Sequence, residues 1–319
     1  MNLRFPGMRI FWNAEEKRLR TFSRLLLQTA LMVALALVPI LLVAEPLTAL
    51  HRHGRFLAGW SPDNYDRVVN MIVGPLLAAA VVGSVALASR WFDHRPWEQF
   101  RAQFDAAGWR GLGLGVCVSA VIIGLVFAVQ RVVGWLHVTG TMATNTAGVS
   151  LGLGLGYSLV KVLCVGIYEE FLSRGYHLRN MTAGLGLAGG LVCSSAIFAL
   201  LHLTNENAGV LSTVGVFVNG LYFASAVLAT GRLATAIGAH VAWNLCEGAV
   251  FGFPVSGDKE PISLIGQQDS GPALWTGGLF GPEGGLLGIL ASMVGIGLMT
   301  AIALRRQRTK LAYRQTRIV

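Results

Sequence analysis

Residues 149–177 read VSLGLGLGYSLVKVLCVGIYEEFLSRGYH, and we begin with this stretch because it sets the fold class. Its first part is an almost unbroken apolar run, long enough to cross a bilayer as a helix of about 20 residues. Its second part contains two adjacent glutamates and an arginine. Ionisable side chains are costly inside a membrane and are expected there mainly at functional sites. The stretch therefore predicts a membrane helix that carries part of a polar site.

The composition of the whole chain supports a membrane protein. Hydrophobic residues make up 54% of the chain and charged residues only 13%, against about 25% charged residues in soluble domains. The net charge of +9 comes mostly from Lys and Arg at the two ends and in short loops, where they face the anionic headgroups of the lipid bilayer. We expect the bilayer, and no nucleic acid, as the partner of these charges.

Eight apolar runs have the length of a membrane span. They predict an all-α polytopic membrane protein with about eight transmembrane helices, a multi-pass protein of the cell membrane. Clusters of Lys and Arg before the first run and after the last predict that both termini are cytoplasmic, which requires an even number of spans. The predicted spans are residues 25–44, 68–89, 112–133, a run from 149, and 188–203, 210–230, 233–253 and 284–304.

The spans divide the chain into five regions. Aromatic and charged residues alternate over residues 96–110, which predicts an amphipathic helix at the membrane interface. The repeated Gly-x-Gly stretches at 111–115 and 152–156 are interpreted as helix-packing surfaces. The regions are a basic cytoplasmic N-terminus (1–24), three accessory transmembrane helices (25–133), a core of spans four to seven (149–253), the last transmembrane helix (284–304) and a basic cytoplasmic tail (305–319).

The fourth span carries the first polar motif. Glu170 and Arg174 are four residues apart, so they share a helix face and can form an ion pair that lowers the cost of burying both charges. Glu169 points roughly 100° away from Glu170 and has no evident partner on its own helix. An unpaired carboxylate in apolar surroundings is suited to act as a general base.

Two further motifs lie on later spans. Phe198-x-x-x-His202 is on the fifth span and His240-x-x-x-Asn244 is on the seventh, and in each the four-residue spacing puts both side chains on one face. A turn within 184–190 places Glu169 and His202 at the same depth of a helical hairpin. One carboxylate, two imidazoles and one carboxamide can then activate a water molecule and stabilise an oxyanion.

Alternative interpretations remain open for these residues. Singly, an intramembrane His or Asn commonly forms a hydrogen bond between helices. A transporter, an adaptor or an immunity protein could use the same polar cavity for binding without hydrolysis, although the chain lacks the internal repeats typical of transporters. Two His and one Glu could also form a zinc site with an open position, but the HExxH helix that would favour zinc is absent.

The order Glu-Glu-x-x-x-Arg, Phe-x-x-x-His, His-x-x-x-Asn on successive membrane helices resembles the CPBP family, the CAAX-protease and bacteriocin-processing (Abi) group of intramembrane proteases. The resemblance covers residues 149–253, roughly a third of the chain. It implies an endopeptidase, either a glutamate protease or a metalloprotease, that acts on a membrane-associated protein or peptide. The implied roles are water activation by Glu169 with His202, oxyanion stabilisation by His240 and Asn244, and support by Glu170 and Arg174.

Overall fold

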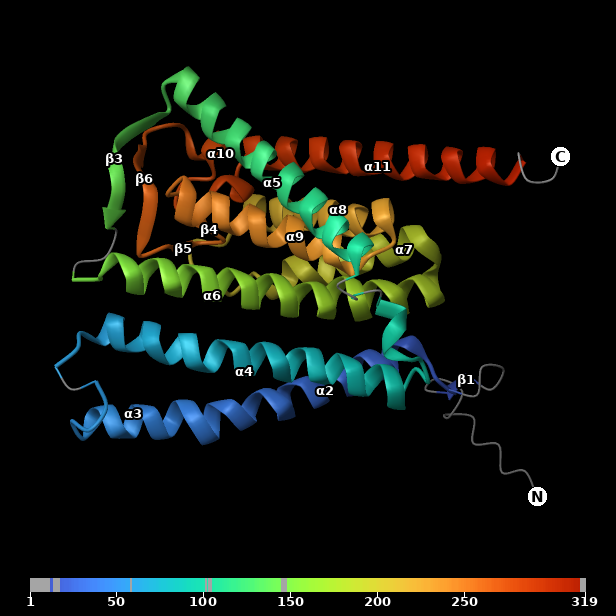
Figure 1. Ribbon diagram of the computed structural model, residues 1–319, viewed down its shortest axis with the longest axis horizontal. Helices are drawn as coiled ribbons and strands as arrows, with labels where there is room; N and C mark the ends of the chain where they lie inside the picture. Colours follow the sequence, from blue (N-terminus) through green and yellow to red (C-terminus); the bar gives the residue numbers. More distant parts are fainter. Residues whose placement is uncertain are drawn as a thin grey trace.

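The computed structural model describes residues 12–13, 18–57, 59–100, 102, 105–144 and 148–315. Long helices dominate it and run side by side, with α5 inclined across the others (Figure 1). The first residues of α2 and the last turns of α11 lie at the same end of the bundle (Figure 1). The long helices are α2 (Thr21–Pro39), α4 (Pro62–Trp91), α5 (Ala106–Val133), α6 (Leu151–Glu170), α7 (Leu178–Leu201), α8 (Val210–Thr230), α9 (Leu233–Asn244) and α11 (Leu286–Gln315).

Shorter elements extend or connect these helices. Three π-helical segments continue α2, α6 and α9 without a break: η1 (Ile40–Ala44), η3 (Phe171–His177) and η4 (Leu245–Val250). The remaining helical segments are α3 (Glu45–Arg52), η2 (Trp97–Phe100), α10 (Ala273–Thr276) and η5 (Pro282–Gly284). The strands are β1 (Trp12–Asn13), β2 (Arg18–Leu19), β3 (Leu136–Thr144), β4 (Pro254–Val255), β5 (Asp258–Lys259) and β6 (Ile262–Asp269).

The all-α polytopic membrane architecture is confirmed, whereas the count of eight spans stays a prediction. Within the described ranges, six helices are long and apolar enough to cross a membrane. One of the six, Leu151–Leu201, comprises α6, η3 and α7. It is bent at Gly186, where φ is 72° and ψ is 173°. A Cβ on Gly190 would lie 2.2 Å from Oγ1 of Thr182, so the chain folds back on itself at the predicted turn.

Small residues allow the core helices to approach closely. A Cβ on Gly115 of α5 would lie 2.1 Å from the backbone oxygen of Thr235 in α9, and a Cβ on Gly238 of α9 would lie 2.3 Å from the backbone oxygen of Leu112. On the other side of α9, a Cβ on Gly166 of α6 would lie 2.5 Å from Cγ2 of Val241. Only glycine fits at such contacts. They support the packing interpretation of 111–115 and bring α6 and α9, which carry four of the six predicted site residues, side by side.

The segment 96–110 does not form the single amphipathic helix that the sequence predicts. Its described part has one 3₁₀ turn, η2, and α5 then begins directly after Asp105, whose side chain accepts a hydrogen bond from the first turn of α5. The ring of Trp97 stacks on that of Phe171 at 5.3 Å, and Phe100 is buried. These aromatic side chains pack onto η3 because they find a protein surface there, so the prediction of a continuous helix was wrong.

The strands β3 to β6 cover the end of the bundle opposite to the first residues of α2 (Figure 1). β3 pairs with β6 in an antiparallel ladder, and β4 pairs with β5 in a tight hairpin. The sequence analysis predicted none of these strands, because they lie in connections between apolar runs. The β4–β5 hairpin forms part of the wall of the candidate site.

Candidate active site

A cavity of about 700 Å³ lies among the core helices. Its walls come from α2, α4, α6, α7, α8 and α9, from the β4–β5 hairpin and from η5. Four of the six predicted site residues line it, namely Glu169, His202, His240 and Asn244. Thr204, Asn205 and Glu206, the polar break after α7, line it as well. The other two predicted residues, Glu170 and Arg174, are fully buried behind the wall.

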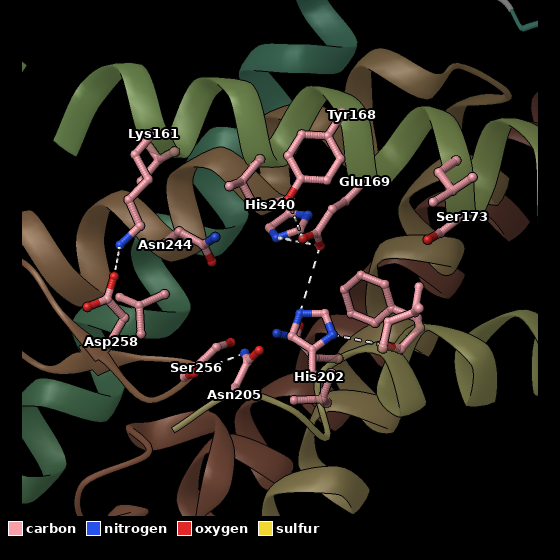
Figure 2. A pocket seen from close by; sticks show the side chains of 18 of the residues that line it. Lys161, Tyr168, Glu169, Ser173, His202, Asn205, His240, Asn244, Ser256 and Asp258 are labelled. Atoms are coloured by element: carbon pink, nitrogen blue, oxygen red, sulfur yellow. Dashed lines mark hydrogen bonds and ion pairs between the residues drawn. The ribbon is translucent and has the colours of Figure 1, made fainter. Parts of the chain in front are cut away.

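Glu169 lies between the two imidazoles (Figure 2). Its Oε2 is 3.9 Å from Nε2 of His202 and 3.9 Å from Nε2 of His240. Oε1 accepts a long hydrogen bond of 3.4 Å from the hydroxyl of Tyr168, whereas Oε2 has no hydrogen-bond partner among the described residues. A separation of 3.9 Å is too long for a direct hydrogen bond and has the length expected of a contact bridged by water.

The hydrogen bonds of the Nδ1 atoms fix the tautomers of both histidine rings. Nδ1 of His202 is 2.8 Å from the backbone oxygen of Phe198, and Nδ1 of His240 is 2.9 Å from Oε1 of Glu170. Because a carbonyl and a carboxylate oxygen can only accept, both Nδ1 atoms carry the proton and donate it. A ring that carries only this proton presents the lone pair of Nε2 to Glu169.

Glu170 and Arg174 form the predicted ion pair, and the structure adds a second function to it. Nη1 of Arg174 donates to Oε1 of Glu170 at 2.9 Å, and Nη2 donates to the backbone oxygen of Gly220 in α8 at 2.9 Å. The guanidinium also lies 4.3 Å from the ring centroid of Phe198. Since the same Glu170 oxygen binds His240, this buried pair orients a cavity histidine as well as joining α6 to α8.

Packing holds His240 and Asn244 in place. The ring of His240 stacks on Phe223 at 4.5 Å with an interplanar angle of 17°. His240 and Asn244 both lie on α9, whose residues are almost all buried because the helix packs between α5, α6 and α8. Asn244 is 9% exposed, and Figure 2 shows its amide directed into the cavity one helical turn from His240. The four-residue spacing thus puts both groups on the same wall, as the sequence predicts.

Zinc fits this arrangement poorly. Bonds of about 2.0–2.2 Å in a tetrahedral zinc site place two ligand atoms about 3.3 Å apart, whereas Oε2 of Glu169 is 3.9 Å from each imidazole nitrogen. In the part of the chain that the structure describes, no group of three His, Cys, Asp or Glu side chains has the arrangement of a metal site. As placed, the three side chains suit a bridging water better than a metal ion.

Several polar groups of the cavity lie outside the three sequence motifs. Lys161 of α6 forms ion pairs with Asp258 at 2.5 Å and Glu260 at 2.9 Å, which attaches the β4–β5 region to the helix. Ser256 and Glu283 also line the cavity, and the Ser256 hydroxyl donates a hydrogen bond to Oε1 of Glu283. Glu283 had one visible signal, an acidic residue in an otherwise apolar, glycine-rich stretch. Nothing in its spacing linked it to the three motifs.

The comparison with known families agrees with this geometry. Residues 151–246 match the family model described as Type II CAAX prenyl endopeptidase Rce1-like. The matched segment runs from the start of α6 into η4 and contains all six motif residues. No curated protein and no solved structure matches the chain. The resemblance to the CPBP family is confirmed over this segment, and it supports a CAAX-type intramembrane protease.

Proposed function

We propose, with the family match over residues 151–246 as the premise, that this chain is an intramembrane endopeptidase whose attacking water is activated by Glu169. The observation that carries the proposal is the position of Glu169 Oε2, which faces Nε2 of both His202 and His240 at 3.9 Å. A water molecule in this gap reaches the carboxylate and an imidazole at hydrogen-bond distances of about 2.8 Å. Glu169 is then the general base, and His202 holds the water.

The tautomers define what His240 contributes. Its Nδ1–H is bound to the Glu170 carboxylate, so Nε2 can donate to an oxyanion only when the ring is doubly protonated. The Glu170 carboxylate stabilises that charged form, as a carboxylate partner does for an imidazolium in other hydrolases. The amide of Asn244 supplies a second, uncharged donor on the same wall. Together they stabilise the negative charge that develops on the scissile carbonyl oxygen.

The walls of the cavity fit a substrate with an apolar tail. Apolar side chains of α2 and α4, namely Met32, Val33, Ala36 and Val81, line the cavity together with the polar groups described above. A membrane-anchored protein or peptide can place its tail against these apolar side chains and its scissile bond near Glu169. Because the matched family is described as a CAAX prenyl endopeptidase, we propose a lipidated C-terminal CAAX peptide as the first substrate to test.

The experiment compares purified wild-type protein with Glu169→Gln on a farnesylated CAAX peptide. The amide keeps the shape of the side chain but cannot accept the proton of water, so the cleavage rate should fall by roughly 10²- to 10⁴-fold, with an unchanged melting temperature in detergent. Glu206→Gln is the matched control, because Glu206 is an exposed residue that lines the same cavity. This variant should cleave the peptide at the wild-type rate. Wild-type cleavage by Glu169→Gln would show that another group is the base.

A further inference from the structure

A second carboxyl group, Glu283, reaches the same cavity from η5. It is 4% exposed and lines the cavity together with His202 and His240. Its place in the fold depends on close packing. Gly281 has φ of 109°, and a Cβ there would lie 2.1 Å from the backbone oxygen of Pro254, so only glycine allows the loop to pass so near to β4. A buried carboxyl group that faces a candidate catalytic centre is a candidate for proton transfer.

The β4–β5 turn holds Glu283 rigidly. Ser256 and Gly257 form the two-residue turn, with φ of 48° and 91°, as in the tight turns of hairpins. The turn is attached on three sides. The amide of Asn205 donates to the Ser256 backbone oxygen at 3.0 Å, the Gly257 backbone nitrogen donates to Phe280 at 2.8 Å, and the Ser256 hydroxyl donates to Oε1 of Glu283. These contacts fix the position of the turn and, through Ser256, of the Glu283 carboxyl group.

The surroundings of Glu283 favour its protonated form. Burial raises the pKa of this carboxyl group, while the Ser256 hydrogen bonds and the positive charge that His202 and His240 carry when protonated oppose the increase. A second buried carboxyl group, Glu247 of η4, lies beside the same loop, since a Cβ on Gly281 would be 3.3 Å from its Oε1. Two adjacent carboxyl groups in a low-dielectric site do not both ionise readily. The two groups can then share one proton, and a carboxyl group that carries a proton can act as a general acid.

We propose that Glu283 is a second catalytic carboxyl group, which protonates the nitrogen of the leaving amine. This inference rests on the proposed function and assigns the general base and the general acid to two different carboxyl groups. Glu169 takes a proton from water as the water oxygen bonds to the scissile carbon. When the C–N bond of the tetrahedral intermediate breaks, Glu283 gives its proton to the nitrogen. Transfer of one proton from Glu169 back to Glu283, through the imidazoles and solvent in the cavity, restores both groups.

The test varies the leaving group. The farnesylated CAAX peptide with its normal amide bond is compared with the same peptide in which a thioester replaces the scissile amide. An amine cannot leave without a proton, whereas a thiolate can, because thiols have a pKa of about 8.5. Glu283→Gln should therefore lower the rate on the amide by on the order of 10²-fold and change the rate on the thioester by less than tenfold. Glu169→Gln, which removes the base, should lower both rates.

Two further variants protect this test against a merely structural effect. Glu260→Gln changes a buried cavity carboxylate that is already bound by Lys161 and Ser158, and it should keep the wild-type ratio of the two rates. Ser256→Ala removes a hydrogen bond that favours the ionised form of Glu283. The pKa of Glu283 then rises, and the alkaline limb of the pH profile for amide cleavage should move to higher pH.

The outcomes separate this inference from the proposed function. Equal losses on the amide and the thioester in Glu283→Gln, or an unchanged amide rate, would overturn the role of Glu283 while a loss in Glu169→Gln leaves the proposed function intact. An alkaline limb that does not move in Ser256→Ala would also contradict the role of Glu283. Full activity of Glu169→Gln on both substrates would instead overturn the proposed function and, with it, this inference.

Discussion

Two buried polar clusters in this protein differ in how closely their members approach. Near the end of the bundle where α2 begins, Arg24 of α2 binds Asp93 and donates to Oδ1 of Asn180 at 2.6 Å, and Asn180 donates to Asp93 at 3.3 Å. In the cavity, Glu169 is 3.9 Å from each of the two histidines. The members of the first cluster form direct hydrogen bonds with one another, whereas Glu169 and the two histidines are too far apart for direct hydrogen bonds and suit a bridging water.

The difference separates polar groups that hold helices from polar groups prepared for chemistry. A buried charge costs several kcal/mol unless it is paired and hydrogen-bonded. The direct contacts of the Arg24 cluster meet this condition, and they join α2, α7 and the end of α4. Oε2 of Glu169 has no hydrogen-bond partner among the described residues, which lowers stability but leaves that oxygen able to bind a reactant. The Glu170–Arg174 pair lies between these cases, since Oε1 of Glu170 is bound by Arg174 and by a cavity histidine, while its Oε2 has no hydrogen-bond partner among the described residues.

Replacement of His240 tests the cavity side of this comparison and should have the largest effect. If His240 stabilises the oxyanion, His240→Ala removes a donor that acts on charge present mainly in the transition state. The turnover number should fall by about 10²- to 10³-fold with little change in KM, measured by steady-state cleavage of the CAAX peptide. A zinc ligand would behave differently: His240→Ala would lose stoichiometric metal, and chelators would inactivate the wild-type protein.

Arg174→Ala should damage both stability and activity. It leaves Glu170 buried without its charged partner, which costs roughly 3 to 5 kcal/mol for a buried pair, and it removes the bond to Gly220. The thermal midpoint in detergent should fall, and the rate should fall too, because Glu170 then holds His240 less firmly. Arg174→Lys restores the charge but not both hydrogen bonds, and it should recover part of each loss. Full stability of Arg174→Ala would contradict the pairing.

Arg24→Ala should damage stability alone. Asp93 keeps its bond to Asn180, so the expected loss is about 3 kcal/mol, at the lower end for a broken buried pair. The Arg24 cluster does not line the cavity, so the rate measured well below the melting temperature should equal that of the wild type. A fall in rate at full folding would show that this cluster does more than hold α2 against α7.

The sequence predicts those parts of the fold and site that depend on helical periodicity. Apolar runs locate the long helices, and the four-residue spacings place Glu170 with Arg174 and His240 with Asn244, because a helix turns by a fixed angle per residue. The turn within 184–190 follows from the same geometry. The hydrogen bond between Glu170 and His240 could not be predicted, since it depends on the close packing of Gly166 against α9.

The parts of the site that come from loops escaped prediction. Glu283 lies 39 residues beyond Asn244 by sequence number, and its route into the cavity depends on the positive φ angles of Ser256, Gly257 and Gly281. Such conformations follow from tertiary contacts and have no periodic signal. The same holds for 96–110, where the aromatic spacing suggested an interfacial helix but the rings found partners on η3.

The salt bridge of Asp105 with Arg232 extends the comparison to an exposed pair and should have the smallest effect. Asp105 lies outside the predicted spans, and its carboxylate contacts both terminal nitrogens of Arg232, at 2.7 and 2.9 Å. The pKa of Asp105 lies below its ordinary value of 3.8, mainly because the backbone nitrogen of Gly108 donates to it, and next because of Arg232. A depressed pKa in the folded state adds stability that is fully present above the unfolded value and is lost as the pH falls through the folded value.

Asp105→Asn keeps the helix cap and removes the charge, so its thermal midpoint should be slightly below that of the wild type at neutral pH. The two midpoints should converge once the pH falls below the folded-state pKa of Asp105, and high salt should reduce the difference because exposed pairs are screened. A gap that persists unchanged at low pH would mean that the charge of Asp105 does not stabilise the fold.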